Sequence, residues 1–224
     1  MVEGSAKPSR SIPEGHDFAE ERKRMVEMQI MRRGLLEPRL LAAFLTVPRH
    51  SFVPAEERYF AYGDGPLHIG SGQTISQPYI VALMTHLLEL TGEERVLEVG
   101  TGSGYQSAIL SLMAMEVHTI EFLPELAERA KKMLADYPNI HCHVGDGSLG
   151  WPEAAPYDGI IVAAAAPKTP QSLHGQLKDG GHLVIPIGGL ANQELEVCTR
   201  HGNNYDCRRE ISVAFVPLRG KEGW

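Results

Sequence analysis

The chain has 224 residues, of which 43% are hydrophobic and 22% are charged, and its net charge is −7. This length suits one large α/β domain with a substantial core. A negative chain lacks the basic surface that a general nucleic-acid binder needs. The sequence also has no apolar run long enough to span a bilayer. We therefore expect no nucleic-acid or membrane partner, and we favour a monomer.

Residues 1–16 are polar and rich in Pro, Gly and Ser, which predicts a disordered tail. They contain no apolar signal core, so we expect a cytoplasmic protein. The three cysteines, Cys142, Cys198 and Cys207, are odd in number and have no CxxC spacing. That pattern favours reduced thiols over a disulfide framework.

Residues 17–224 are predicted to form a single domain, in which a helical part over 17–91 precedes a sheet over 92–224. The spacing of apolar residues predicts a first helix over 18–30 that stops near Gly34. The helical part continues with a helix over 38–45, a long aperiodic loop over 48–77, and an apolar helix over 78–90.

After Gly92, short apolar runs alternate with helical stretches. This alternation predicts an α/β fold, a doubly wound Rossmann-like sheet with helices on both faces and an N-terminal helical extension. We expect strands at 95–99, 117–121, 140–144, 157–163, 182–187, 194–199 and 210–216, with helices at 105–114, 124–136 and 170–177.

A glycine-rich loop follows the first of these strands. Gly100, Gly102 and Gly104 stand at alternate positions, and Glu98 lies two residues before them. Glycines let the chain turn sharply and let a ligand approach the backbone. A dinucleotide site needs G-x-G-x-x-G, and here Tyr105 stands where that pattern requires a small residue. The E-x-G-x-G-x-G pattern better fits S-adenosyl-L-methionine, which has an amino group and a sulfonium but no phosphate.

Two further acidic residues follow this pattern: Glu121 ends the next strand, and Asp146 comes just after the strand over 140–144. Glu121 can accept both hydroxyls of a ribose, although NAD enzymes use the same position. Asp146 lies between Gly145 and Gly147 and can accept a hydrogen bond from the exocyclic amine of adenine. Acidic groups and glycines at three consecutive strand ends together indicate a nucleoside site.

Four sequence runs resemble those of protein-L-isoaspartate O-methyltransferases. They are QTISQP at 73–78, VLEVGTGSGYQ at 96–106, GDG at 145–147 and FVPL at 215–218. The resemblance extends from about residue 18 to 218. It implies methyl transfer from S-adenosyl-L-methionine to the free α-carboxylate of L-isoaspartyl residues in damaged proteins and peptides. In that family the methyl ester then forms a succinimide, which begins the repair.

The resemblance implies a role for each matching residue. The active-site serine falls on Ser76, with Thr74, Ile75 and Val216 beside the substrate. The cofactor positions fall on Glu98, Gly100, Gly102, Gly104, Glu121, Asp146 and Gly147.

The residues alone leave alternatives open. Ser76 precedes Pro78 and is also typical of a helix cap, and both roles can hold together. Other S-adenosyl-L-methionine-dependent methyltransferases, acting on a different small molecule or protein, share the glycine loop. An NAD-linked oxidoreductase is disfavoured by the glycine spacing. A non-catalytic binding module would not need the segment over 74–76.

The run His141-Cys142-His143 suggests a metal site at first sight. On a strand, however, alternation places both histidines on one face and the cysteine on the other, which leaves two ligands at most. We therefore predict no metal.

Overall fold

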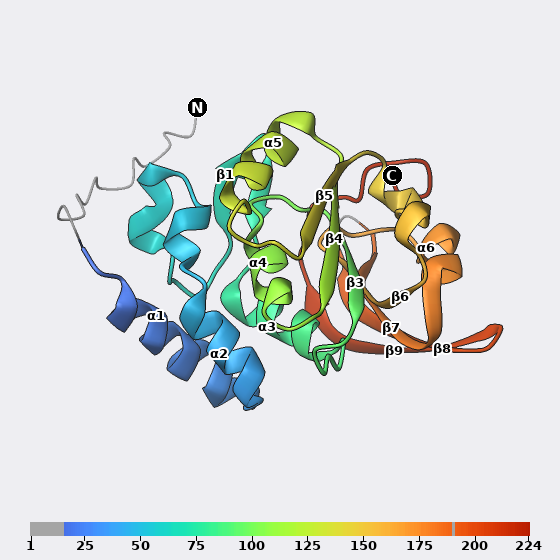
Figure 1. Cartoon of the computed structure of the whole chain (residues 1–224), viewed down its shortest axis with the longest axis horizontal. Coiled ribbons are helices and arrows are strands. Elements are labelled where there is room, and N and C mark those ends of the chain that lie inside the picture. Colours follow the sequence, from blue (N-terminus) through green and yellow to red (C-terminus); the bar gives the residue numbers. More distant parts are fainter. Residues whose placement is uncertain (1–15, 190) are drawn as a thin grey trace.

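The computed structural model describes residues 16–189 and 191–224 (Figure 1). All but the last residue of the tail expected over 1–16 lies outside the described residues. Among the described residues, no helix combines the length and apolar character needed to cross a bilayer.

Seven strands form one sheet in the order β5-β4-β3-β6-β7-β8-β9. The strands from β5 to β7 in this order pair in parallel, and β8 and β9 add an antiparallel edge. Their bounds are Arg95–Val99 (β3), Glu116–Glu121 (β4), Ile140–Val144 (β5), Tyr157–Val162 (β6), Leu177–Gly188 (β7), Gln193–His201 (β8) and Asn204–Val213 (β9). The predicted doubly wound sheet is confirmed.

Helices cover both faces of this sheet, as Figure 1 shows. One face packs against α3 (Pro78–His86), α4 (Tyr105–Ser111) and α5 (Pro124–Met133), and the other against α6 (Gln171–Gln176). Side chains alternate between the two faces of a strand, and helices cover both faces, so each central strand is buried on both sides. In β3, for example, Val96 joins the core under α3 to α5, whereas Leu97 and Val99 join the core under α6.

The first two predicted helices are also present. Helix α1 (Ala19–Met25) continues through a π turn (η1, Val26–Ile30) and a 3-10 turn (η2, Met31–Arg33). Gly34, with φ +90°, then ends it in the left-handed conformation that glycine favours. Helix α2 (Pro38–Thr46) follows.

The expectation of an aperiodic loop over 48–77 is wrong. The segment contains two 3-10 turns, η3 (Arg49–Phe52) and η4 (Ala55–Phe60), and a hairpin of β1 (Leu67–Gly70) and β2 (Gln73–Ile75). Each element is too short to show a hydrophobic period, so periodicity could not reveal it. This hairpin carries Thr74 and Ile75 and leads directly into Ser76, three of the four expected substrate residues.

The expectations for the C-terminal hairpin also need correction. Strand β9 begins at Asn204 and ends at Val213, so Val216 lies beyond the sheet and not on its last strand. The register of β8 and β9 places Cys198 directly opposite Cys207, and the two form a disulfide. The prediction of reduced thiols therefore fails for this pair, because strand register rather than sequence spacing brought the sulfurs together.

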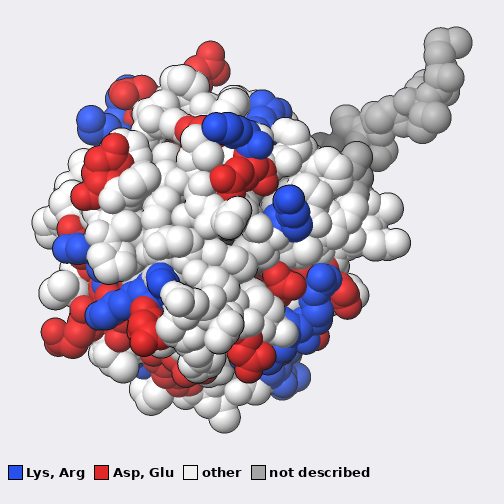
Figure 2. Space-filling model, turned by 90° about the vertical axis from the view of Figure 1, so that its right-hand side faces the viewer, with Lys and Arg blue, Asp and Glu red and all other residues white. Residues whose placement is uncertain are grey.

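Figure 2 shows the charges on one side of the molecule. Lys and Arg side chains are interspersed there with Asp and Glu, and uncharged surface separates them. On this face the two signs are mixed, so it presents no continuous basic area.

Gly104 supports the fold through both its backbone and its lack of a side chain. It precedes α4 with φ +87°, and a Cβ there would lie 3.1 Å from Cγ of Leu134. Gly34 has nearly the same φ, but a Cβ there would meet nothing within 4 Å. A comparison of Gly34 with Gly104 therefore separates backbone strain from steric overlap.

We expect Gly34→Ala to lower the free energy of unfolding by about 1–2 kcal/mol from strain alone. Gly104→Ala should cost about 1–3 kcal/mol more, because Leu134 must also move. Urea unfolding of both variants measures the difference. Equal losses would show that Leu134 does not confine this position.

Candidate active site

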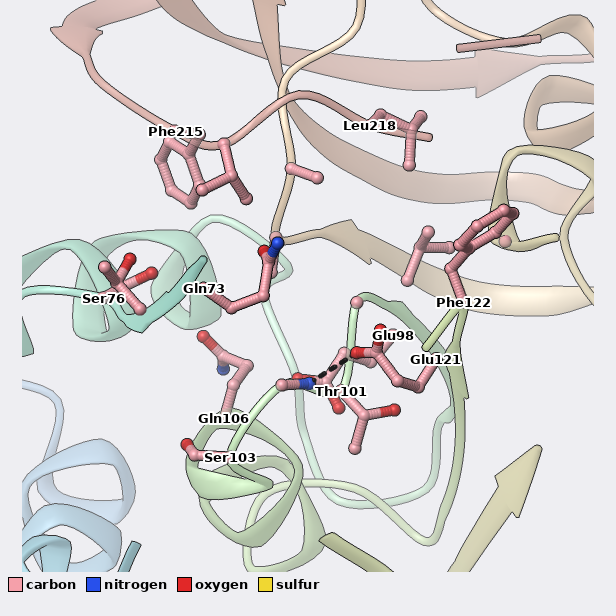
Figure 3. A pocket seen from close by; sticks show the side chains of 18 of the residues that line it. Gln73, Ser76, Glu98, Thr101, Ser103, Gln106, Glu121, Phe122, Phe215 and Leu218 are labelled. Carbon is pink, nitrogen blue, oxygen red and sulfur yellow. Dashed lines mark hydrogen bonds between the residues drawn. The ribbon is translucent and has the colours of Figure 1, made fainter. Parts of the chain in front are cut away.

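A pocket lies at the carboxyl ends of β3, β4 and β6 (Figure 3). Strand β3 pairs with β4 on one side and with β6 on the other, so the strand order reverses at this point. Open α/β sheets bind ligands at such a switch point because the loops leave the two neighbouring strands in opposite directions. The hairpin residues 73–76 and the segment 215–219 complete the walls.

The glycine loop bends through left-handed backbone conformations. Gly100, Gly102 and Gly104 have φ values of +95°, +55° and +87°. Gly100 and Gly102 line the pocket, and their bare backbone leaves room for a ligand. Gly104 does not line it and packs against Leu134. The structure therefore places two of the three glycines where a cofactor could touch them.

Glu98 is fully buried at the floor of the pocket. Its Oε2 accepts hydrogen bonds from the hydroxyls of Ser107 and Thr119, the latter at 2.7 Å. Its Oε1 is buried and has no hydrogen-bond partner among the described residues. Burial raises the pKa of Glu98 to about 8, against the hydrogen bonds that lower it. A buried acceptor without a donor fits a ligand that brings a positive charge or an N–H group.

Glu121 lines the same side of the pocket as Glu98, as Figure 3 shows. Its Oε2 accepts a hydrogen bond from the backbone N–H of Gly102 at 2.8 Å, and its Oε1 accepts one from Leu123 at 3.0 Å. These two bonds hold the carboxylate at the end of β4. Each oxygen keeps a further lone pair, so the group can still accept from a ribose.

Asp146 and Gly147 separate in the structure, although they are neighbours in sequence. Gly147 lines the pocket, and a Cβ there would lie 2.6 Å from Cγ1 of Val99. Asp146 does not line it. Its carboxylate accepts hydrogen bonds from the N–H and hydroxyl of Ser148 and from the N–H of Lys221. The C-terminal segment therefore binds the Asp146 carboxylate, which the sequence analysis expected to accept a hydrogen bond from adenine.

Ser76 lies where the hairpin meets α3, on the side of the pocket facing away from Glu121 (Figure 3). It lines this pocket and also an adjoining groove, and Thr74 does the same. Helix α3 has Gln77 at its N-cap and no side-chain cap, so the capping interpretation of Ser76 is wrong. Among the described residues its hydroxyl has no hydrogen-bond partner, so it is available to a ligand at the junction of the two cavities. Ile75 is buried and lines the pocket beside it.

Residues 212–216 line the groove together with Thr74 and Ser76, and Phe215 and Val216 line both cavities. The carbonyl of Val216 accepts a hydrogen bond from Ala165 at 2.8 Å. The amide of Gln193 holds Phe215 from both sides, accepting from its N–H at 2.6 Å and donating to its carbonyl at 3.1 Å. Gln193 is buried, and no motif in the sequence indicated this clamp.

Arg49 is a second residue that the sequence did not reveal. It is fully buried in η3, within the segment expected to be a loop. Its guanidinium donates to the carbonyls of Ala61 at 2.8 Å and of Ser76 at 2.7 Å, and it lies over the Tyr105 ring. Burial lowers the pKa of Arg49 to about 10, so it keeps its charge at neutral pH. A buried cation thus positions the backbone of Ser76 against the glycine loop.

Glu98 makes the stability of the free protein depend on pH. A carboxyl whose pKa rises from 4.5 to about 8 on folding stabilises the fold below pH 4.5 and loses that contribution up to about pH 8. Glutamine does not titrate, so the Glu98→Gln variant does not lose this stability as the pH rises. The unfolding free energy of the variant relative to wild type should therefore rise from pH 5 to pH 8, by on the order of a few kcal/mol, and then level off.

Chemical denaturation at several pH values measures this difference, with Glu128→Gln on the exposed face of α5 as the control. A difference that stays constant with pH would show that Glu98 is not protonated in the folded chain.

Comparison with known proteins agrees with this geometry. The family model for protein-L-isoaspartate(D-aspartate) O-methyltransferase matches residues 20–223. A protein-L-isoaspartate O-methyltransferase of Methanoregula boonei is 53% identical over 208 residues, covering 92% of this chain and 96% of the relative. One of Pelotomaculum thermopropionicum is 53% identical over 209 residues, covering 92% and 91%.

Solved structures lead to the same family. A protein-L-isoaspartate O-methyltransferase structure superposes with a TM-score of 0.81 at 27% identity, covering 90% of this chain and 67% of the other. A putative Plasmodium falciparum enzyme, solved in complex with S-adenosyl-L-homocysteine, has the same fold, with a TM-score of 0.75 at 23% identity and coverage of 91% and 99%. The chain therefore belongs to the protein-L-isoaspartate(D-aspartate) O-methyltransferase family.

Proposed function

We infer that the chain transfers the methyl group of S-adenosyl-L-methionine to the free α-carboxylate of L-isoaspartyl residues in damaged proteins and peptides. Relatives with this name share half of its residues over nearly their whole length. The observation that carries the inference is the position of Ser76, which borders both the glycine-loop pocket and the groove beside it. One cavity suits the methyl donor and the other suits a peptide, and they meet at this residue.

The pocket residues fit the donor. The unpaired Oε1 of Glu98 suits its positive end, and the bare backbone at Gly100 and Gly102 lets it approach the loop. The Glu121 carboxylate at the end of β4 suits the ribose hydroxyls. Gly147 lines the pocket and has no side chain that would fill it. Asp146 would have to give up its hydrogen bond with the N–H of Lys221 to reach the adenine.

The groove residues fit an extended peptide. Phe215 and Val216 form one wall, and Thr74 and Ser76 form the other. Gln193 and Arg49 hold these two walls in place through the backbones of Phe215 and Ser76. We propose that Thr74, Ile75, Ser76 and Val216 contact the acceptor.

The chemistry needs positioning more than proton transfer. S-adenosyl-L-methionine supplies a methyl group bonded to a positively charged sulfur. The α-carboxylate is ionised at neutral pH, since its pKa is about 3.5, so no base has to remove a proton. As the new C–O bond forms and the S–C bond breaks, opposite charges disappear, and a site that excludes water favours this step. We propose that the Ser76 hydroxyl donates to the acceptor carboxylate and holds it in line with the methyl group.

The product explains the link to repair. A methyl ester on the isoaspartyl carboxylate is open to attack by the neighbouring main-chain nitrogen, which expels methanol and closes a succinimide. Hydrolysis of that ring can restore an ordinary aspartyl linkage. The chain need only form the ester.

We also propose that the chain acts as a cytoplasmic monomer without a nucleic-acid partner. The net charge of −7 and the mixed charges of Figure 2 support the last point, because nucleic-acid binding requires a basic surface.

A peptide pair tests the acceptor. In an isoaspartyl peptide the main chain runs through the side-chain carbon, which shifts the free carboxylate by one methylene. A groove that fixes the peptide backbone converts this shift into misplacement of the nucleophile. We expect methylation of an isoaspartyl peptide, little or none of the aspartyl peptide of the same sequence, and a base-labile product. Equal rates on both peptides would point to another acceptor.

Two variants test the division of the site. A hydroxyl–carboxylate hydrogen bond contributes about 1.5–3 kcal/mol, so Ser76→Ala should lower kcat roughly 10- to 150-fold with unchanged cofactor affinity. Glu121→Ala should do the reverse, weakening S-adenosyl-L-methionine binding at least several-fold. Calorimetry and single-turnover rates on the same preparations separate the two effects. A folded Ser76→Ala protein with normal kcat would remove the serine from the mechanism.

A further inference from the structure

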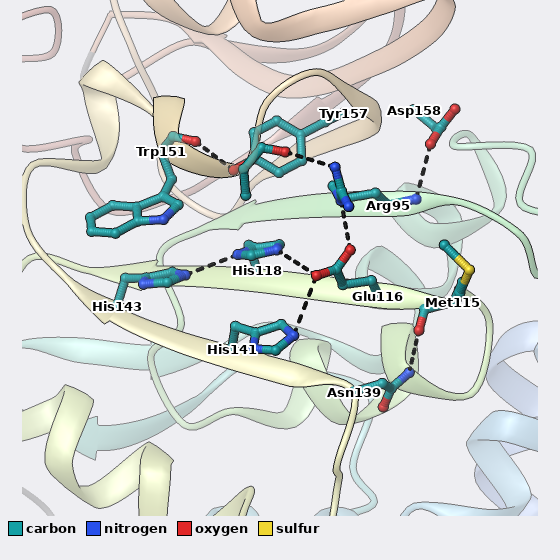
Figure 4. A network of polar contacts seen from close by, with 11 residues as sticks. Arg95, Met115, Glu116, His118, Asn139, His141, His143, Trp151, Tyr157 and Asp158 are labelled. Atoms are coloured by element: carbon teal, nitrogen blue, oxygen red, sulfur yellow. Dashed lines mark hydrogen bonds and ion pairs between the residues drawn. The ribbon is translucent and has the colours of Figure 1, made fainter.

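A cluster of histidines lies on the sheet face that carries α6, away from the glycine loop (Figure 4). Glu116 and His118 stand two residues apart on β4, and His141 and His143 stand two apart on β5. Alternation points both pairs to the same face, and the parallel register sets His118 beside His141. None of the four residues lines the pocket described above. The methyltransferase reaction therefore does not account for the cluster.

We propose that Glu116, His118 and His141 bind a divalent transition-metal ion of the zinc type. Oε1 of Glu116 lies 3.1 Å from Nε2 of His118 and 3.4 Å from Nε2 of His141. Tetrahedral zinc with bonds of about 2.0–2.1 Å would separate two such ligand atoms by about 3.3 Å. One ligand atom from each of the three residues lies within 4.8 Å of the others. The two glutamate–histidine distances are therefore already close to the spacing that the ion needs.

Neighbouring groups hold the three ligands in orientation. Nε of Arg95 lies 2.6 Å from Oε2 of Glu116, which leaves Oε1 turned toward the histidines. Nδ1 of His118 lies 3.0 Å from Nε2 of His143, whose ring stacks on Trp151 at 4.0 Å. Metal-binding histidines commonly donate their other ring N–H to a hydrogen-bond acceptor, usually a carboxylate, a carbonyl or water. Here Nε2 of His143 can be that acceptor, which leaves the metal-facing nitrogen of His118 unprotonated. His143 is therefore a positioning residue and not a ligand.

The same contacts can form without a metal if Nε2–H of His118 and of His141 donates to Glu116. A bound ion would replace those two protons. Access is open, since His141 is 48% exposed and Glu116 is 24% exposed, whereas His118 is nearly buried. Three protein ligands leave a fourth position for water. Nitrogen and oxygen donors of this kind select zinc, copper or nickel over magnesium and calcium.

A second group of potential ligands, His174, Cys198 and Cys207, does not share these properties. Its two sulfurs are joined in a disulfide and cannot act as thiolates.

The test uses the full chain after removal of metals by a chelator and dialysis. Calorimetry with ZnCl2 and elemental analysis should show one zinc per chain, and zinc but not magnesium should raise Tm. His141→Ala and Glu116→Gln should abolish both effects. His143→Ala should lower the zinc affinity about 10- to 100-fold. His68→Ala, an exposed histidine on β1, is the matched control and should behave as wild type.

Cobalt replaces zinc as a spectroscopic probe of the same ligands. The wild type should show the visible absorption of a four-coordinate site, and Glu116→Gln should change it. Circular dichroism verifies that each variant is folded. Absence of stoichiometric zinc binding, or equal binding by wild type and His141→Ala, would overturn the proposal. The cluster would then be a hydrogen-bonded network without a metal.

Discussion

Parallel pairing of β3 with both β4 and β6 is the constraint on which the site depends. It brings the carboxyl ends of three strands to one edge of the sheet, although β6 lies about sixty residues further along the chain than β3. The loops that leave these ends must diverge, and the gap between them becomes the pocket. Glu98 and Glu121 converge there because they stand at the carboxyl ends of β3 and β4. Gly147 joins them from the loop that follows β5, the other neighbour of β4.

The pocket carries a cost that the rest of the fold offsets. Burying a carboxyl with one unpaired oxygen at Glu98 is unfavourable, as its raised pKa shows. Left-handed turns at Gly100 and Gly102 add constraints that only glycine meets easily. The two apolar cores on either side of the sheet supply the stability that tolerates them. Such local conflicts are typical of sites that await a ligand.

Strand β4 serves different chemistry on its two faces. Thr119 points to the side of α4 and donates to Glu98 beneath the pocket. Its neighbour His118 points to the opposite face and joins Glu116 in the proposed metal site. Period-two alternation makes this division possible, since adjacent residues cannot share a face. The two sites thus share a strand without sharing any side chain.

The sequence by itself determined much of this protein. Periodicity located most of the helices and strands, and the alternate glycines after 95–99 indicated the pocket, because these signals arise within short windows of chain. Resemblance to a family singled out Ser76 and Val216, and both line the pocket and the groove. Periodicity did not predict the hairpin over 67–75, because its strands are too short to show a period.

Only the tertiary structure decided which groups meet. The Asp146 carboxylate meets the backbone N–H of Lys221, the backbone of Gly104 packs against Leu134, and Cys198 faces Cys207, and no local pattern encodes these contacts. The sequence also limited the histidines of β5 to two ligands. Strand register then placed Glu116 and His118 beside them, because pairing between strands depends on the packing of the whole sheet.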